Sequence, residues 1–220
     1  MHAMLQASDR GALRIEPASA CLGADIHGVD VATLVRAPDH GTIDALKSAL
    51  DRHLVLRFRQ PALSNADICA FGALFGTLLG ERQNPEDKES AQLDEYAELK
   101  VISNAAAGDG RMLGDKGAEP QIWHTDGAHR ATPNAYSLLY ARKVPPDPPR
   151  TGFLSAYALY ESLPASLRDE IAGLRAIFSV HNRSQSYWTF MEGPSVDLQR
   201  RADGPAHPLV RLHPLSLIHI

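Results

Sequence analysis

Five consecutive residues, Trp123-His124-Thr125-Asp126-Gly127, combine side-chain types that can hold a metal ion. His124 and Asp126 are separated by one residue, and on an extended strand such residues point to the same face. An imidazole nitrogen and a carboxylate oxygen could then reach one metal ion from a single short segment. A second histidine from a distant segment would complete a 2-His-1-carboxylate triad, which binds Fe(II) and leaves coordination positions open. The spacing alone also fits a surface or helix-capping pair.

The composition fits one soluble globular domain. The chain has 220 residues, of which 44% are hydrophobic and 22% charged, with a net charge of −4; it lacks the basic balance typical of a general nucleic-acid binder. No apolar run approaches the ~20 residues of a membrane span, and Met1–Arg14 lacks the apolar centre of a signal peptide. Cys21 and Cys69 form neither a disulfide framework nor a C-x-x-C pair. We expect a cytoplasmic protein without nucleic-acid or membrane partners.

Hydrophobic periodicity predicts the elements of the first half. The segment Ala12–Val31 is typical of short strands and turns, and the periodicity of Thr42–Arg52 predicts a helix. Leu54–Phe58 is interpreted as a central strand. Ser64 is a candidate N-cap for the next helix, because Asp67 follows it in the S-x-x-D capping pattern.

Strand patterns dominate the second half. We expect strands at Leu99–Ser103, Tyr136–Val144 and Thr151–Ser155, and a helix in two pieces over Tyr157–Leu174, with Ser162 capping the second piece. These patterns predict a mainly β, α+β fold: an antiparallel sheet with helices packed outside it. A jelly roll is the natural candidate.

Further motifs lie both before and after the metal-binding candidate. They are Leu54–Gly76, Pro133 with Leu138–Ala141 and Val144-Pro145, Thr151–Tyr157 with Leu163-Pro164 and Gly173–Ala176, and His207–Arg211 with His213-Pro214. Together with Trp123–Asp126 they resemble the taurine dioxygenase (TauD/TfdA-like) family of Fe(II)- and 2-oxoglutarate-dependent dioxygenases.

This resemblance implies a fold, a cofactor and roles for individual residues. The fold would be a double-stranded β-helix (jelly roll) forming a single domain over residues 1–214. His124 and Asp126 would be two of the iron ligands, Thr151 would help to hold 2-oxoglutarate, and Asn104 would lie on the substrate side of the site. A turn-forming role at the end of a strand stays open for Asn104.

Two departures from the family pattern stand out. Pro148-Pro149-Arg150 replaces the usual Gly-Gly-Asp before Thr151, which makes this loop stiffer and more basic. The third iron ligand, a distal histidine, and the arginine that pairs with 2-oxoglutarate belong to a family segment that nothing after Pro214 resembles. His207 and His213 resemble an upstream segment, and His181 resembles a position that is not a ligand.

The last six residues, Leu215–Ile220, break abruptly from the family pattern. They can be encoded by a sequence that resembles the end of a transposon adapter used in sequencing libraries. We therefore interpret residues 215–220 as a non-native tail and the jelly roll as incomplete at the C-terminus, although a native short strand is an alternative. We expect this 220-residue chain to be poorly soluble and inactive by itself.

The sequence thus predicts a dioxygenase that uses Fe(II), 2-oxoglutarate and O₂ to hydroxylate a C–H bond of a small organic substrate, with succinate and CO₂ as co-products. Arg82, Arg111 and Arg130 are candidates to pair with an anionic substrate, although each also fits a solvated charge. A non-catalytic jelly-roll protein that binds a small molecule or partner is the alternative, and a metal-dependent hydrolase is a third option. Homo-oligomers are common in the family.

Overall fold

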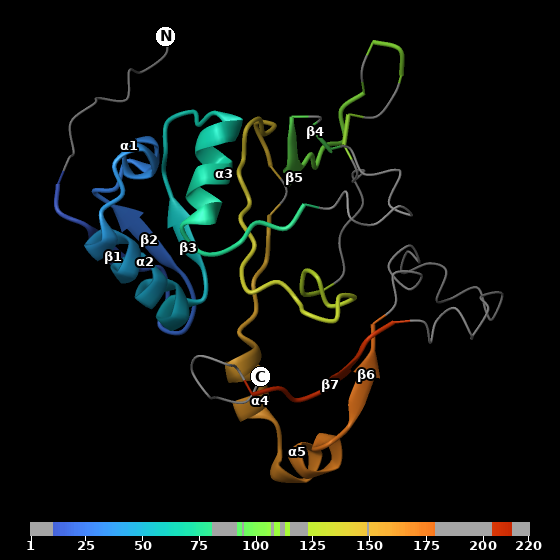
Figure 1. The fold of residues 1–220 in the computed structure, drawn as a ribbon. Helices are drawn as coiled ribbons and strands as arrows, with labels where there is room; N and C mark the ends of the chain where they lie inside the picture. The colour runs from blue at the N-terminus through green and yellow to red at the C-terminus, as the bar shows by residue number, and fades with distance from the viewer. Residues whose placement is uncertain are drawn as a thin grey trace. The chain divides into compact units, whose positions relative to one another are not determined.

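The computed structural model describes residues 11–80, 92–93, 95–106, 108–110, 113–114, 123–148, 150–178 and 204–212 (Figure 1). The chain divides into two compact units. Unit 1 comprises Met1–Pro120 and Tyr140–Pro149, and unit 2 comprises Gln121–Leu139 and Arg150–Ile220.

Unit 1 contains three helices and two small sheets among its described residues. Its elements, in chain order, are β1 (Arg14–Pro17), β2 (Ala24–His27), α1 (Val31–Arg36), α2 (His40–His53), β3 (Leu56–Phe58), α3 (Asn65–Ala73), β4 (Gln92–Leu93) and β5 (Tyr96–Lys100). One sheet has the order β1-β2-β3 and the other pairs β4 with β5. The predicted helix at Thr42–Arg52 is confirmed as α2, and the predicted strand at Leu99–Ser103 begins and ends three residues earlier, as β5.

The three-stranded sheet corrects two predictions. β1 and β2 pair antiparallel, but β2 and β3 pair parallel, because α1 and α2 carry the chain back to the same end of the sheet. The strand predicted at Leu54–Phe58 begins only at Leu56 and is the last strand of this sheet rather than a central one. Leu54 instead ends α2 with φ of 66°, where its N–H donates to the carbonyl of Leu50.

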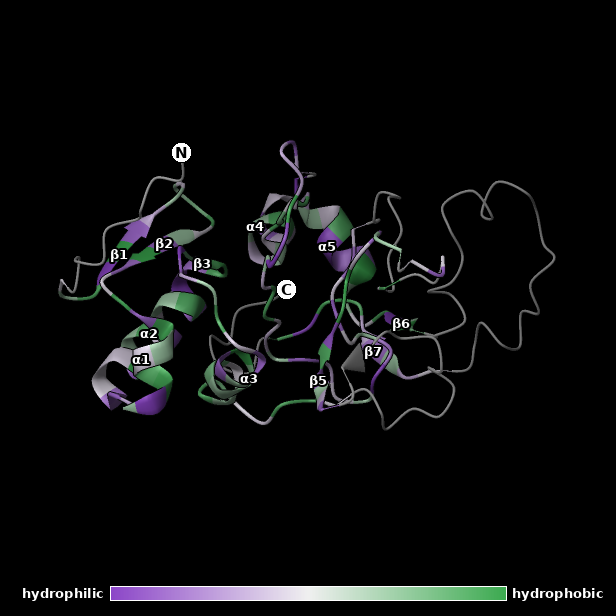
Figure 2. Ribbon diagram, turned by 90° about the horizontal axis from the view of Figure 1, so that it is seen from above, coloured by the Kyte–Doolittle hydropathy of each residue, from purple (hydrophilic) through white to green (hydrophobic). Residues whose placement is uncertain are grey.

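The core of unit 1 lies between the inner face of the sheet and its helices. Its buried residues are Ile26, Val31, Leu34, Ile43, Leu46 and Phe71. Phe58 and Phe75 pack edge-on against Phe71, with ring centroids 5.4 and 5.3 Å apart. Figure 2 shows hydrophobic and hydrophilic residues together on α1 and α2, as expected for helices with one buried face.

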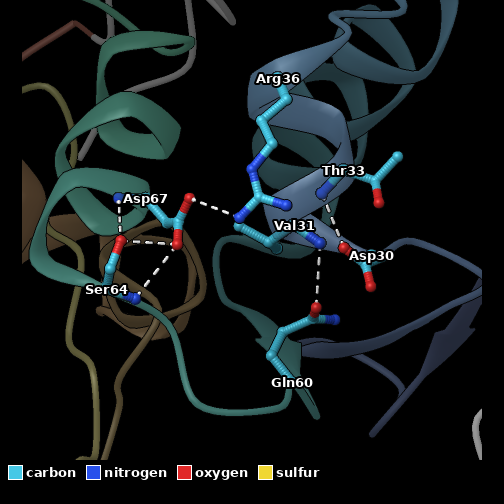
Figure 3. Close-up of polar contacts among 7 residues, drawn as sticks. All are labelled: Asp30, Val31, Thr33, Arg36, Gln60, Ser64 and Asp67. Carbon is cyan, nitrogen blue, oxygen red and sulfur yellow. Dashed lines mark hydrogen bonds and ion pairs between the residues drawn. The ribbon is translucent and has the colours of Figure 1, made fainter.

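Side-chain hydrogen bonds define the starts of α1 and α3 (Figure 3). Ser64 and Asp67 form the predicted capping box, in which each side chain accepts the other residue's backbone N–H. Gln60 holds the turn before α1: its Oε1 accepts the Val31 N–H at 3.0 Å, and its Nε2 donates to the Val29 carbonyl at 2.8 Å. An Arg36–Asp67 ion pair of 3.5 Å then joins α1 to α3.

Unit 2 has fewer strands than predicted. Its described elements are α4 (Ala156–Ser162), α5 (Ala165–Ile171) and the antiparallel pair β6 (Arg175–Ile177) and β7 (Ala206–Pro208). The helix in two pieces is therefore confirmed. Ser162 does not cap the second piece: its hydroxyl donates to the Leu159 carbonyl within α4, and Pro164 occupies the N-cap of α5.

The strands predicted at Tyr136–Val144 and Thr151–Ser155 are not formed; both segments are irregular. A strand needs a neighbour that exchanges backbone hydrogen bonds with it. Among the described residues, no strand pairs with either segment. Tyr140 and Arg142 instead interact through their side chains, the Tyr140 hydroxyl accepting the Leu63 N–H and Arg142 donating to Asn65.

Gln60 offers a direct test of how α1 is held. Replacing Gln60 by Ala leaves the part-buried Val31 N–H without its acceptor and the Val29 carbonyl without its donor. The free energy of unfolding should therefore fall by about 1–3 kcal/mol. Urea unfolding measures this change. The exposed neighbouring residue gives a control, Arg59→Ala, which should change stability by less than about 0.5 kcal/mol. Equal effects of the two substitutions would contradict the role of Gln60.

The capping box predicts a pH dependence of stability. The Ser64 hydroxyl and N–H hold the pKa of Asp67 below its ordinary value of 3.8. A carboxyl group with a lowered pKa stabilises the folded state at pH values above its pKa in the unfolded chain. This contribution is lost as the pH falls through its pKa in the folded state. In urea unfolding, the stability gap between the wild type and Ser64→Ala should therefore be larger at about pH 6 than at about pH 2.5. A gap that is constant over this range would contradict the prediction.

Candidate metal centre

The structure brings the two predicted metal ligands together in unit 2. His124 Nε2 lies 3.5 Å from Asp126 Oδ1, and the two side chains are 54% and 56% exposed. The strand predicted to carry them is absent, since residues 123–125 are irregular and a turn begins at Asp126. Because only one residue separates them, the two side chains can approach each other without the hydrogen bonds of a β-sheet.

Gly127 shapes the turn that follows the pair. Its φ of 72° lies in the left-handed region that favours glycine. A Cβ at this position would lie 2.5 Å from Asn134 Oδ1, so a larger residue would also require the Asn134 side chain to move. The Arg130 N–H closes the turn by donating to the Gly127 carbonyl at 2.9 Å. The chain thereby turns sharply directly after Asp126.

Ser137 contacts the candidate metal ligand from beyond this turn. Its hydroxyl donates to Asp126 Oδ2 at 2.8 Å. The two oxygens of Asp126 therefore have different neighbours, Ser137 at Oδ2 and His124 at Oδ1. Sequence reasoning missed Ser137, because no local pattern connects it with a residue eleven positions earlier; Gly127 immediately after the aspartate was the available signal for a returning turn.

The pair fits a divalent transition metal. Imidazole nitrogen and carboxylate oxygen are ligands that iron and its neighbours accept. Two donors at about 2.1 Å from one ion and at right angles to each other lie about 3 Å apart, close to the 3.5 Å between Nε2 and Oδ1. Among the residues that the structure describes, no third histidine, cysteine or carboxylate joins the pair.

His207 supports this turn from the β6–β7 sheet. It is buried, its Nε2 lies 2.9 Å from the Arg130 carbonyl oxygen, and its ring packs beside Phe178. Through this contact His207 holds the backbone carbonyl of Arg130, and among the described residues it does not join the His124–Asp126 pair in a metal-binding cluster. His181 and His213 lie outside the described residues.

Trp123 connects the segment of the predicted metal ligands to the segment of Thr151. Although Trp123 is 72% exposed, a Cβ added to Gly152 would lie 3.0 Å from its ring carbon Cη2. The residue before His124 thus packs on the residue after Thr151, whose own side chain is exposed.

Asn104 belongs to unit 1, where it is exposed and follows β5 after a short irregular stretch. This position agrees with a residue beyond the end of a strand. Its role on the substrate side stays a prediction. Of the arginines considered for an anionic substrate, Arg130 is half-buried, and Arg82 and Arg111 lie outside the described residues.

Comparison with known proteins identifies the family. Residues 14–218 match the family described as "Taurine catabolism dioxygenase TauD, TfdA family". The chain belongs to the TauD/TfdA family. No helix among the described residues of this family member is long and apolar enough to cross a membrane.

Curated relatives agree with this assignment. The alpha-ketoglutarate-dependent 2,4-dichlorophenoxyacetate dioxygenase of Cupriavidus pinatubonensis is 31% identical over 84% of this chain and 65% of its own length. Pentalenolactone F synthase of Streptomyces avermitilis is 33% identical over 76% of this chain and 52% of its own length. The chain thus spans less than two thirds of each relative.

The fold comparison extends over most of the chain. A crystal structure of AAD-2 in complex with Mn(II) and N-oxalylglycine superposes with a TM-score of 0.65 and 22% identity, covering 95% of this chain and 68% of that one. The likeness shows that this chain shares its fold with AAD-2 over most of its length.

The contact between Trp123 and Gly152 predicts the effect of a larger side chain. Gly152→Val should displace the exposed indole of Trp123, because the added Cβ would lie 3.0 Å from its ring carbon Cη2. The shift of Trp123 can be followed by fluorescence in a Trp188→Phe background, which leaves one of the two tryptophans. Gly108→Val is the control, since a Cβ there meets open space. Unchanged fluorescence in Gly152→Val would rule out the contact.

Proposed function

We propose that this chain forms part of an Fe(II)- and 2-oxoglutarate-dependent dioxygenase that hydroxylates a C–H bond of a small organic substrate. The observation that carries the proposal is the convergence of His124 Nε2 and Asp126 Oδ1 in a chain of the TauD/TfdA family. The family and the named relatives support 2-oxoglutarate as co-substrate. The donor set, one imidazole and one carboxylate, supports Fe(II) as the metal of a facial triad.

The residues of this chain have distinct roles in the proposed site. His124 contributes Nε2 and Asp126 contributes Oδ1, while a distal histidine would complete the triad. When bound, Fe(II) with 2-oxoglutarate and O₂ supplies oxidising power for C–H hydroxylation and releases succinate and CO₂. Thr151 anchors 2-oxoglutarate, and Asn104 contacts the substrate. The proposed domain is a single TauD/TfdA-like domain over residues 1–214, with a jelly roll that is incomplete at the C-terminus.

The substrate is proposed as a small organic anion. The relative from Cupriavidus pinatubonensis is named for 2,4-dichlorophenoxyacetate, which carries a carboxylate. Arg130 lies four residues after Asp126, at the end of the turn that Asp126 begins, and its N–H and carbonyl are both engaged by hydrogen bonds. A guanidinium on a turn held at both backbone groups is suited to pair with a carboxylate near the metal.

The test uses the protein encoded by the longest natural reading frame that contains this chain. Fe(II) and 2-oxoglutarate are added together without oxygen, and the weak visible absorption band of their complex is recorded. We expect the wild type to form the band and His124→Ala to lose it, because one protein ligand is missing.

A matched histidine provides the control. His40 is exposed at the start of α2 in unit 1, so His40→Ala should form the band as the wild type does. A folded wild-type protein without the band would overturn the dioxygenase proposal in favour of a non-catalytic binding protein. A band that persists in His124→Ala would overturn the assignment of the ligand.

A further inference from the structure

The carboxylate of Asp126 is held from two sides by two different groups. Ser137 donates its hydroxyl proton to Oδ2 at 2.8 Å, while Oδ1 faces His124 Nε2 at 3.5 Å. A hydroxyl that donates to one carboxylate oxygen holds the plane of the carboxyl group and occupies a lone pair on that oxygen. The structure therefore distinguishes the two oxygens before any metal binds.

We infer that Ser137 is a positioning residue that restricts Asp126 to binding the metal through Oδ1 alone. This inference rests on the proposed function. An octahedral ion has six positions, and the facial triad leaves the remaining ones open. In the proposed site, 2-oxoglutarate and O₂ would need these open positions. A carboxylate bound through both oxygens would take one position that the co-substrates need.

The local structure explains why Ser137 can act on Asp126. The left-handed conformation of Gly127 and the hydrogen bond from Arg130 to Gly127 turn the chain sharply after the aspartate. His207 holds the far end of this turn by its contact with the Arg130 carbonyl. The position of the serine hydroxyl thus depends on the turn and not on a neighbouring strand.

The experiment compares substitutions that differ by one hydroxyl group. Ser137→Thr keeps the hydroxyl, whereas Ser137→Val has nearly the same shape without it. In the full-length protein, Mn(II) is titrated first, followed by 2-oxoglutarate at saturating Mn(II), with electron paramagnetic resonance as the readout. Ser162→Ala is the control, because that hydroxyl donates to a helix carbonyl in α4.

We expect Ser137→Val to weaken 2-oxoglutarate binding to the Mn(II)-loaded protein about tenfold, the lower end of the range for groups that orient metal ligands, because Ser137 and Asp126 are both exposed. Mn(II) itself should still bind, since the released carboxylate oxygen can add a bond to the metal. Ser137→Thr and Ser162→Ala should match the wild type in both titrations. A purely structural role would not separate the threonine from the valine variant in the 2-oxoglutarate titration.

Two outcomes would overturn the inference, and they are distinguishable from each other. If Ser137→Val and Ser137→Thr bind Mn(II) and 2-oxoglutarate equally well while His124→Ala has lost Mn(II), the metal site stands and the role of Ser137 is wrong. If His124→Ala still binds Mn(II) as the wild type does, the ligand assignment fails and the inference fails with it.

Discussion

The orientation of one carboxylate, that of Asp126, is the constraint on which the candidate site depends. Its two oxygens have separate neighbours, His124 and Ser137, so the group has a defined direction although it is half exposed. That direction depends in turn on Gly127, because its left-handed backbone favours a residue without Cβ and turns the chain directly after the aspartate. A backbone turn, rather than a sheet, therefore arranges the pair of ligands.

The two units differ in how their elements are held. Unit 1 has a contiguous apolar core and helices whose ends are capped by their own neighbours, such as Ser64 by Asp67. Among the described residues of unit 2, long-range contacts hold the functional segments, including that of His207 with Arg130 and that of Trp123 with Gly152.

The predictions that failed share a physical cause. Residues 136–144 and 151–155 have the apolar and β-branched composition of strands, but composition does not provide a pairing partner. The parallel pairing of β2 with β3 was missed for the same reason, because it depends on the path of α1 and α2 between them. Hydrogen bonds between distant segments are the part of a fold that local patterns cannot specify.

The sequence by itself determined the features that act over a few residues: α2, the capping box of α3, the two helical pieces after Thr151, and the spacing that lets His124 and Asp126 approach one another. It also contains the motifs that resemble the TauD/TfdA family, to which the chain belongs. Only the tertiary structure decided that Ser137 reaches Asp126 and that His207 is engaged by a carbonyl 77 residues away along the chain. Caps and periodic faces arise from neighbours in the chain, whereas these contacts require the turn at Gly127 and the β6–β7 pair to be formed first.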